Sequence, residues 1–385
     1  MKIKQSPDDF EVEEVTDIIP SDVGSFAFYR LDKTGWTTPD ALQVVCKRLK
    51  IDLRRVSYAG LKDRHAHTRQ YLTIHNGPPR GIDQEAIHLD YLGRVGAAYT
   101  SDGIRCNRFG ITIRDIDEAR ISEVDHRLEI VSRLGVPNYF DDQRFGSVAG
   151  GEFIAAHLVR GRFEEGLRLA LTAPYAFDRA AQKHEKQILH NHWGDWAACA
   201  AALPRGHAWG IVEYLRIRNG DFRGAVARLR PELRGLYLSA YQSHLWNRTL
   251  ARWLDGHATG SLRRVMLRLG EVPLAENLSD ATFEELAALR LPLATSRWKP
   301  EVGDSRLPLV EAVLAEDGLT LRDMQVRGVR ELFFSRGERP ALARVEALTP
   351  TWADDERHPG RRKLTLSFRL PRGSYATLVV KAIME

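Results

Sequence analysis

Alternating and helical patterns of apolar residues divide this chain into two strand-rich ends and a helix-rich middle. Residues 10–18, FEVEEVTDI, alternate as a half-buried strand does, and 26–35, FAFYRLDKTG, predict its hairpin partner. In residues 37–50 the apolar side chains recur on one helical face, with Thr38 as the expected N-cap and Pro39 at the first helical position. The N-terminal end therefore predicts a sheet with at least one packed helix.

Further elements follow the same reasoning. We expect short strands at 54–60 and 69–74, a strand pair around 105–116 and a helix over 121–134. In the middle, residues 238–256 form the clearest helix, with a capping-box spacing at Ser239 and Gln242. The C-terminal end returns to a strand, a Pro-Gly turn and an apolar stretch.

This distribution predicts one domain inserted into another. The fold class is α+β: a mixed or largely antiparallel sheet with helices, and an inserted helix-rich α/β domain. The expected boundaries are 1–161 and 335–385 for the two parts of the outer domain, and 162–334 for the inserted domain.

Composition narrows the class of protein. The 385 residues carry a formal net charge of +5, which only hints at a polyanionic partner. The three cysteines are far apart, which disfavours a disulfide framework or a zinc ribbon and fits a reducing cytoplasm. No apolar run has the length of a membrane span, and the N-terminal residues show no secretory signal. A basic run at 357–374 is either a charged strand edge or a phosphate-contacting surface.

The strongest candidate for chemistry is the stretch YAGLKDRHAHTRQ at 58–70. Asp63 follows a Gly turn at the end of a predicted strand, where scaffolds present working side chains. Flanking cations favour its ionised form, in which it can act as a nucleophile or a base. The alternative is a surface turn residue paired with a neighbour.

A second candidate is VPNYFDDQRFG at 136–146. Asn138 carries paired donors and acceptors suited to a base edge, and Phe140 is an aromatic ring on which a base could stack. The alternative is an aromatic turn that packs onto its own core. The histidines lack the spacing of metal ligands, and no nucleotide-binding glycine motif is present, so we expect neither a metal nor a cofactor.

Five blocks in this order resemble the TruD family of RNA pseudouridine synthases. They are KIKQSPDDFEVEE, YAGLKDRHAHTRQ, VPNYFDDQRFG, LYLSAYQSHLWN and LPRGSYATLVVKAIM. The resemblance implies that Asp63 is the catalytic aspartate and that the substrate-contacting positions are Lys4, Phe10, Asn138, Phe140 and Tyr375. The implied reaction converts uridine to pseudouridine in RNA, best known at uridine 13 in the D arm of tRNA, without a cofactor or a metal. Asp141 departs from the family, which commonly has Gly there.

The resemblance also implies a cytoplasmic enzyme that acts on RNA, and nothing in the sequence demands more than a monomer. It implies a catalytic cleft between the two domains. Two alternatives stay open: a catalytically silent RNA-binding module on the same scaffold, and a hydrolase that uses Asp63 with His65 or His67. The module has no need for the carboxylate, and the hydrolase requires a histidine held against it.

Overall fold

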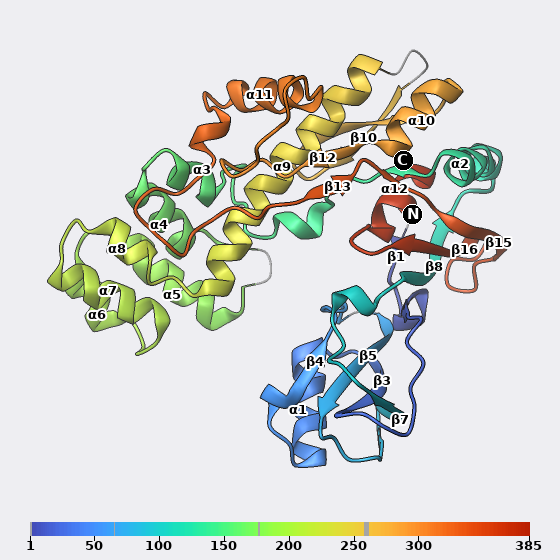
Figure 1. The fold of residues 1–385 in the computed structure, drawn as a ribbon, viewed down its shortest axis with the longest axis horizontal. Coiled ribbons are helices and arrows are strands. Elements are labelled where there is room, and N and C mark those ends of the chain that lie inside the picture. The colour runs from blue at the N-terminus through green and yellow to red at the C-terminus, as the bar shows by residue number, and fades with distance from the viewer. Residues whose placement is uncertain (1, 65, 176–177, 258–261) are drawn as a thin grey trace. The chain divides into compact units, whose positions relative to one another are not determined.

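The computed structural model describes residues 2–64, 66–175, 178–257 and 262–385 (Figure 1). The chain forms two compact units, Met1–Val136 with Ala343–Glu385, and Pro137–Leu342. Composition placed these boundaries at 161/162 and 334/335. The structure divides the chain differently because the short helix α3 (Ile154–Val159) packs on α9 (Pro231–His257) of the second unit. His65, one of the two histidines of the hydrolase alternative, lies outside the described residues.

A mixed sheet forms the framework of the first unit, in the strand order β15-β16-β8-β2-β5-β3-β7-β6. The β2–β5 pair is parallel and the other neighbours on this path are antiparallel. Two short strands extend it, β1 beside β8 and β4 beside β5. The strands are β1 Lys2–Ile3, β2 Phe10–Val15, β3 Phe26–Thr34, β4 Val56–Tyr58, β5 His67–His75, β6 Ile82–Gln84, β7 Ile87–Val95, β8 Cys106–Ile116, β15 Glu346–Asp354 and β16 Arg362–Pro371.

The predicted hairpin between β2 and β3 is wrong. Strand β5 lies between them, so that Thr68 is paired with Val12 on one side and Lys33 on the other. Alternation identifies a strand but does not choose its neighbour, because pairing depends on segments distant in sequence. The pair expected around 105–116 is likewise one continuous strand, β8, whose partners come from both ends of the chain.

Helices α1 (Thr38–Leu49), α2 (Ile121–Leu134) and α12 (Ala376–Met384) belong to this unit. The apolar face of α1 packs against β3 and β5 in a core that includes Leu31, Leu42 and Leu72. The N-cap of α1 is Thr37, whose side chain accepts a hydrogen bond from the backbone N–H of Asp40, and not Thr38 as predicted. The hydroxyl of Thr38 is buried.

The second unit is helix-rich, as expected. It contains α3, α4 (Phe163–Thr172), α5 (Ala180–Asn191), α6 (Trp196–Ala202), α7 (His207–Ile217), α8 (Phe222–Val226), α9, α10 (Asp280–Ala288) and α11 (Arg306–Glu316). Its strands are the hairpin β10 (Leu262–Leu267) with β11 (Gly270–Ala275), and the pair β12 (Arg290–Pro292) with β13 (Glu338–Pro340). Short strands β9 (Val136–Pro137) and β14 (Leu342–Ala343) lie where the chain passes between the units. The α+β class is confirmed.

The long helix α9 crosses the second unit (Figure 1). It begins at Pro231, so Ser239 and Gln242 lie inside it and do not form the predicted capping box. The Ser239 hydroxyl donates to the carbonyl of Leu236 within the helix. Gln242 is buried and donates to the carbonyls of Ala294 and Ser335, which ties distant loops to the helix.

Candidate active site

The loop that carries Asp63, residues 59–64, joins β4 to β5. Hydrogen bonds from the surrounding elements hold it: Gln70 donates to the Gly60 carbonyl (3.3 Å), and the backbone N–H of Lys62 donates to the Thr38 hydroxyl (3.0 Å). The Thr38 hydroxyl in turn donates to Gln70 at 2.9 Å. A catalytic group on a loop needs such fixed supports to stay in a productive orientation. We refer to this segment as the Asp63 loop.

The Asp63 carboxylate forms an ion pair with the Lys4 ammonium. The same ammonium lies 4.2 Å from the centre of the Phe10 ring, a cation–π contact. The structure thus brings together three of the residues that the sequence selected. Lys4 has a φ of 57°, in the left-handed region that non-glycine residues rarely occupy, and strained positions of this kind cluster at functional sites.

Lys33 is a residue of this site that the sequence analysis did not select. Its side chain is almost fully buried, and its ammonium donates to the backbone carbonyls of Asp63 (3.0 Å) and Trp36 (2.8 Å). Burial lowers the pKa of Lys33 to about 8, although the nearby Asp63 charge acts in the opposite direction. Its position in the sequence could have indicated this burial, because Tyr29, Leu31 and Lys33 are alternate residues of β3 and lie on the same buried face.

Lys62, beside the catalytic candidate, is tied to the sheet. Its ammonium lies 2.8 Å from the carboxylate of Glu14 and donates to the side-chain oxygen of Asn107 at 3.2 Å. Glu14 is fully buried and also accepts from the backbone N–H of Tyr71 and the hydroxyl of Tyr99. These contacts show that the cations around the Asp63 loop are structural anchors as well as charges.

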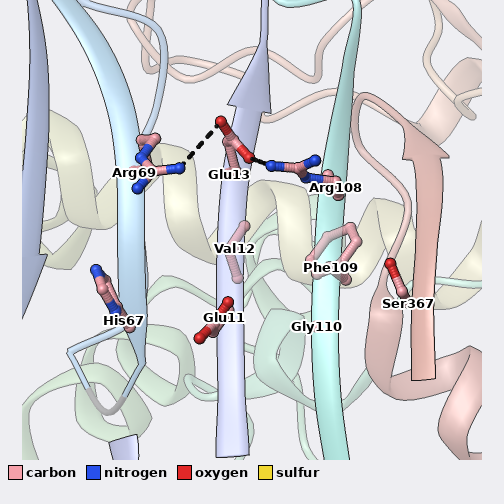
Figure 2. A pocket seen from close by; sticks show the side chains of 9 residues that line it. All are labelled: Glu11, Val12, Glu13, His67, Arg69, Arg108, Phe109, Gly110 and Ser367. Atoms are coloured by element: carbon pink, nitrogen blue, oxygen red, sulfur yellow. Dashed lines mark hydrogen bonds and ion pairs between the residues drawn. The ribbon is translucent and has the colours of Figure 1, made fainter. Parts of the chain in front are cut away.

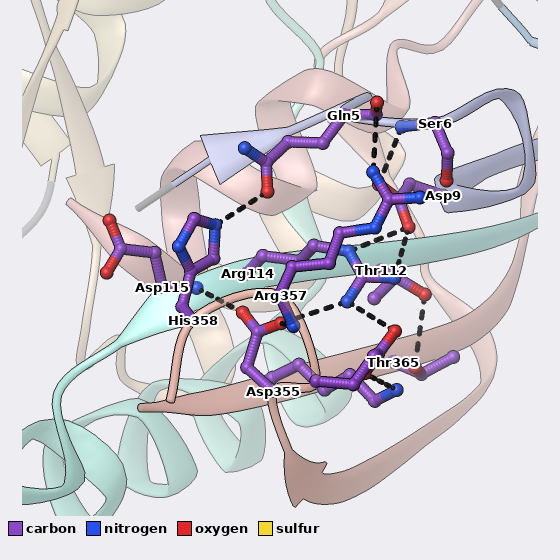
Figure 3. A network of polar contacts seen from close by, with 12 residues as sticks. Gln5, Ser6, Asp9, Thr112, Arg114, Asp115, Asp355, Arg357, His358 and Thr365 are labelled. Carbon is purple, nitrogen blue, oxygen red and sulfur yellow. Dashed lines mark hydrogen bonds and ion pairs between the residues drawn. The ribbon is translucent and has the colours of Figure 1, made fainter. Parts of the chain in front are cut away.

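A buried ionic network holds the segment that precedes Phe10 (Figure 3). Arg114 of β8 donates to the carboxylates of Asp9 and Asp355, both at 3.0 Å. Burial raises the pKa of the Asp9 carboxyl, but the hydrogen bonds from Arg114 and the Ser6 backbone outweigh it and lower that pKa. The network fixes the turn between Lys4 and Phe10 to β8 and to the C-terminal part of the chain.

In the second unit, Asn138 and Phe140 lie in a densely bonded turn. The Asn138 amide donates to the Pro340 carbonyl (3.1 Å) and accepts from Arg339 (2.7 Å). The backbone N–H and C=O of Phe140 both bond to the side chain of Asn247, each at 2.8 Å. The Arg339 guanidinium lies 4.2 Å from the centre of the Phe140 ring. The third sequence block, which contributes Asn247, therefore supports the second.

Asp141 takes ordinary extended backbone, with φ −87° and ψ 171°. The departure from the family's Gly therefore creates no strain at this position. The carboxylate of the adjacent Asp142 accepts from the backbone N–H of Arg268 at 2.7 Å. The loop keeps a defined conformation with both acidic residues present.

Tyr375 is half-buried at the N-cap position of α12, where its carbonyl accepts from the backbone N–H of Leu378. The neighbouring hydroxyl of Ser374 is buried. Most of the basic run before it is paired with carboxylates: Arg361 with Asp115 and Asp117, and Lys363 with Glu356. These pairs favour the charged strand edge over a phosphate-contacting surface for this part of the run.

A cavity of about 220 Å³ lies against the sheet (Figure 2). The strand register and the alternation of side chains place Glu11, Glu13 and His67 on the face opposite to Lys33 and Glu14. His67 lines it together with Glu11, while Thr68, the next residue, faces the Lys33 side. Glu13 forms ion pairs with Arg69 and Arg108 in its wall. This placement of His67 argues against the form of the hydrolase alternative in which His67 faces Asp63.

Within the described part of the chain, no cluster of three or more histidine, cysteine or acidic residues is arranged to hold a metal ion. In the same residues, no helix combines the length and the apolar character that crossing a membrane requires.

Comparisons with known proteins identify the family of the chain. A family model described as tRNA pseudouridine synthase D (TruD) matches residues 1–383. The tRNA pseudouridine synthase D of Aquifex aeolicus is 29% identical over 395 residues, covering 100% of this chain and 98% of the relative. The protein of that name from Geobacter sp. strain M21 is 29% identical over 405 residues, covering 100% and 96%.

A solved structure, described as tRNA pseudouridine synthase D (TruD) from Methanosarcina mazei, superimposes with a TM-score of 0.73 at 25% identity. The match covers 100% of this chain and 93% of that one. The architecture and the near-complete match define an RNA-modifying isomerase of the pseudouridine synthase class. The chain belongs to the TruD family.

Proposed function

We propose that this protein isomerises uridine to pseudouridine in tRNA, at uridine 13 of the D arm, with Asp63 as the catalytic residue. It would work as a cytoplasmic monomer without a metal or a cofactor. Family membership supports the reaction, and one observation carries the assignment of Asp63. The carboxylate is ion-paired with Lys4 on a loop that Lys33, Gln70 and Thr38 hold in place.

The reaction detaches uracil from the sugar, turns it and reattaches it through carbon, so the substrate and product have the same atoms. Asp63 acts in its ionised form, which the Lys4 ammonium favours by direct pairing. The same ammonium offsets negative charge that the substrate brings to the site. Lys33 holds the backbone of Asp63 and so orients the carboxylate.

A base inside a folded RNA must be extruded before it can react, at a cost of a few kcal/mol. We assign base contacts to Phe10, Phe140 and Tyr375, since stacking on an aromatic ring contributes about 1–3 kcal/mol per base. Asn138 would recognise the edge of uracil through the amide donor and acceptor positions that its hydrogen bonds to Pro340 and Arg339 do not use.

The test uses a strain that lacks the gene, rescued with the wild type, Asp63→Ala or Asp83→Ala. Asp83 is the matched control because its side chain is 90% exposed on β6 and pairs only with His88 in the described structure. Pseudouridine in tRNA is mapped by carbodiimide labelling and reverse-transcription stops. We expect the stop at position 13 to return with the wild type and Asp83→Ala, and to stay absent with Asp63→Ala.

Three results would count against the proposal. Restoration by Asp63→Ala would remove the catalytic role of that carboxylate. Unchanged stops across all strains would exclude tRNA uridine 13 as the substrate. A purified wild type that releases free uracil from the RNA would indicate the hydrolase, because isomerisation leaves the mass of the RNA unchanged.

A further inference from the structure

A surface groove in the second unit lies outside every block that the proposed function uses. It is a cavity of about 410 Å³ formed by the segments 295–297 and 324–334. The groove has room for a nucleobase or a short aromatic ligand. Its charges and its one exposed ring decide what it would bind.

The segment 324–334 repeats with a period of three. Val326, Val329 and Leu332 are buried, and each is followed by a residue that lines the groove and is exposed to solvent: Arg327, Arg330 and Phe333. The buried residues anchor the backbone, so the two guanidinium groups and the ring lie on a fixed edge. The bond from Gln242 to the Ser335 carbonyl anchors the end of the segment to α9.

Phe333 is 60% exposed and is the sole aromatic residue among the large hydrophobic side chains that are exposed in the described part of the chain. The Arg297 guanidinium lies 4.8 Å from the centre of its ring. An Arg–Phe pair of this kind is a stacking platform for a nucleobase, because both partners present flat faces. Leaving such a ring in water has no packing benefit.

The charges of the groove are unbalanced. Arg327 is 74% exposed, and Asp323, its partner in the described structure, stands at a distance of 3.7 Å. Arg330 is also exposed, and the lining residues include no carboxylate. This differs from Arg361 in the basic run of the first unit, whose guanidinium lies 3.0 Å from Asp115 and 2.6 Å from Asp117. Cations that lack close partners are available for phosphates.

We propose that this groove binds a single-stranded segment of the RNA substrate, with Arg327 and Arg330 on phosphates and a base stacked on Phe333. The proposal rests on the proposed function for the identity of the RNA, but not on the chemistry of Asp63. An acidic protein segment would satisfy the two arginines and would leave the ring without a stacking partner. RNA supplies both features in one strand.

The test measures the affinity of the full-length protein for unmodified tRNA over a range of salt concentrations, by filter binding. Arg327→Gln with Arg330→Gln should weaken binding on the order of tenfold and reduce the slope of log K against log salt by about 1.4, or 0.7 per phosphate contact. Phe333→Ala should weaken binding on the order of tenfold, as expected for one lost stack, with the slope unchanged.

Matched controls come from the same unit. Arg322→Gln removes one exposed charge from the short 3-10 helix just before the groove segment, outside the groove lining. Ile217→Ala truncates an exposed apolar residue on α7. Both should bind as the wild type does. Groove variants that bind as tightly as these controls would overturn the proposal. So would polyglutamate that competes with tRNA for the groove and depends equally on Phe333, because that result points to an acidic protein partner.

Binding and catalysis fail separately in this design. If the groove variants lose affinity while the wild type forms no pseudouridine, the groove stands and the isomerase assignment falls. If the wild type is active and the groove variants bind normally, the isomerase assignment stands and the groove proposal falls. With both correct, the groove variants should raise KM and keep kcat, since the groove lies apart from the Asp63 loop in sequence and unit.

Discussion

Replacing Arg114 by Met is the sharpest test of how the first unit is held together. The guanidinium is buried between two buried carboxylates, Asp9 and Asp355, and also donates to Glu356 at 2.9 Å. Methionine keeps an unbranched apolar stem but is shorter and has no charge and no donors. The substitution would leave two carboxylates in the interior without their cation (Figure 3).

Breaking a buried ion pair from one side destabilises a protein by about 3–5 kcal/mol. We expect the low end, about 3 kcal/mol, because Asp355 keeps the backbone N–H of Asp115 as a donor and Glu356 is more than half exposed to water. For a unit of this size each kcal/mol lowers the melting temperature by about 2–4 °C, so the expected shift is roughly 6–12 °C.

Differential scanning calorimetry is the suitable assay, because it can separate the transitions of two units. The control is Arg361→Met, whose guanidinium also contacts two aspartates, Asp115 and Asp117, but at the surface. Surface pairs contribute little to stability, so this variant should melt close to the wild type. Equal melting temperatures for the Arg114 and Arg361 variants would refute the reasoning. Burial would then have no effect on the contribution of an ion pair to stability.

Three further outcomes follow from the contacts. The pKa values of Asp9 and Asp355 in the folded state lie below the ordinary 3.8. Their contribution to stability is therefore present above pH 3.8 and is lost as the pH falls below it. The free energies of unfolding of the wild type and the Arg114 variant, measured in urea, should converge in acid. Lys33→Met should lower kcat at saturating tRNA by about tenfold or more with little change in KM, because a misplaced catalytic group slows the chemical step. Single-turnover kinetics measure that step directly, and an unchanged single-turnover rate would contradict the prediction. Asn247→Leu should destabilise the second unit by about 2 kcal/mol, because it removes both bonds to the Phe140 backbone, and a calorimetric transition like that of the wild type would contradict this.

Local patterns along the chain were sufficient for several of the helices and strands. Helix α2 occupies the predicted residues 121–134, and β3 occupies nearly all of its predicted range, because each has a long periodic apolar face. Asp63, Lys4 and Phe10 were selected from motifs, and the Lys4 ammonium contacts both the Asp63 carboxylate and the Phe10 ring. Family resemblance supplied this selection, since spacing alone left a surface turn as an alternative.

Properties that depend on partners distant in sequence could not be obtained this way. The neighbours of β2 are β8 and β5, and β3 is not one of them, because strand pairing depends on the whole sheet. Ser239 could cap a helix only if the helix began there, and α9 begins earlier, at Pro231, a residue whose fixed φ suits the first helical position. The role of Lys33 depends on burial against a loop some thirty positions away, which its own neighbours do not encode.

The sequence by itself therefore determined the class of protein, the residue types of the site and the periodic elements, since these depend on local order along the chain. Only the tertiary structure decided which charges are buried, which are paired and which remain available. Arg114 and Arg327 are both arginines near acidic residues in sequence, yet one is enclosed by carboxylates and the other is open to solvent. That difference arises from the dielectric surroundings of each charge, which exist only after the chain has folded.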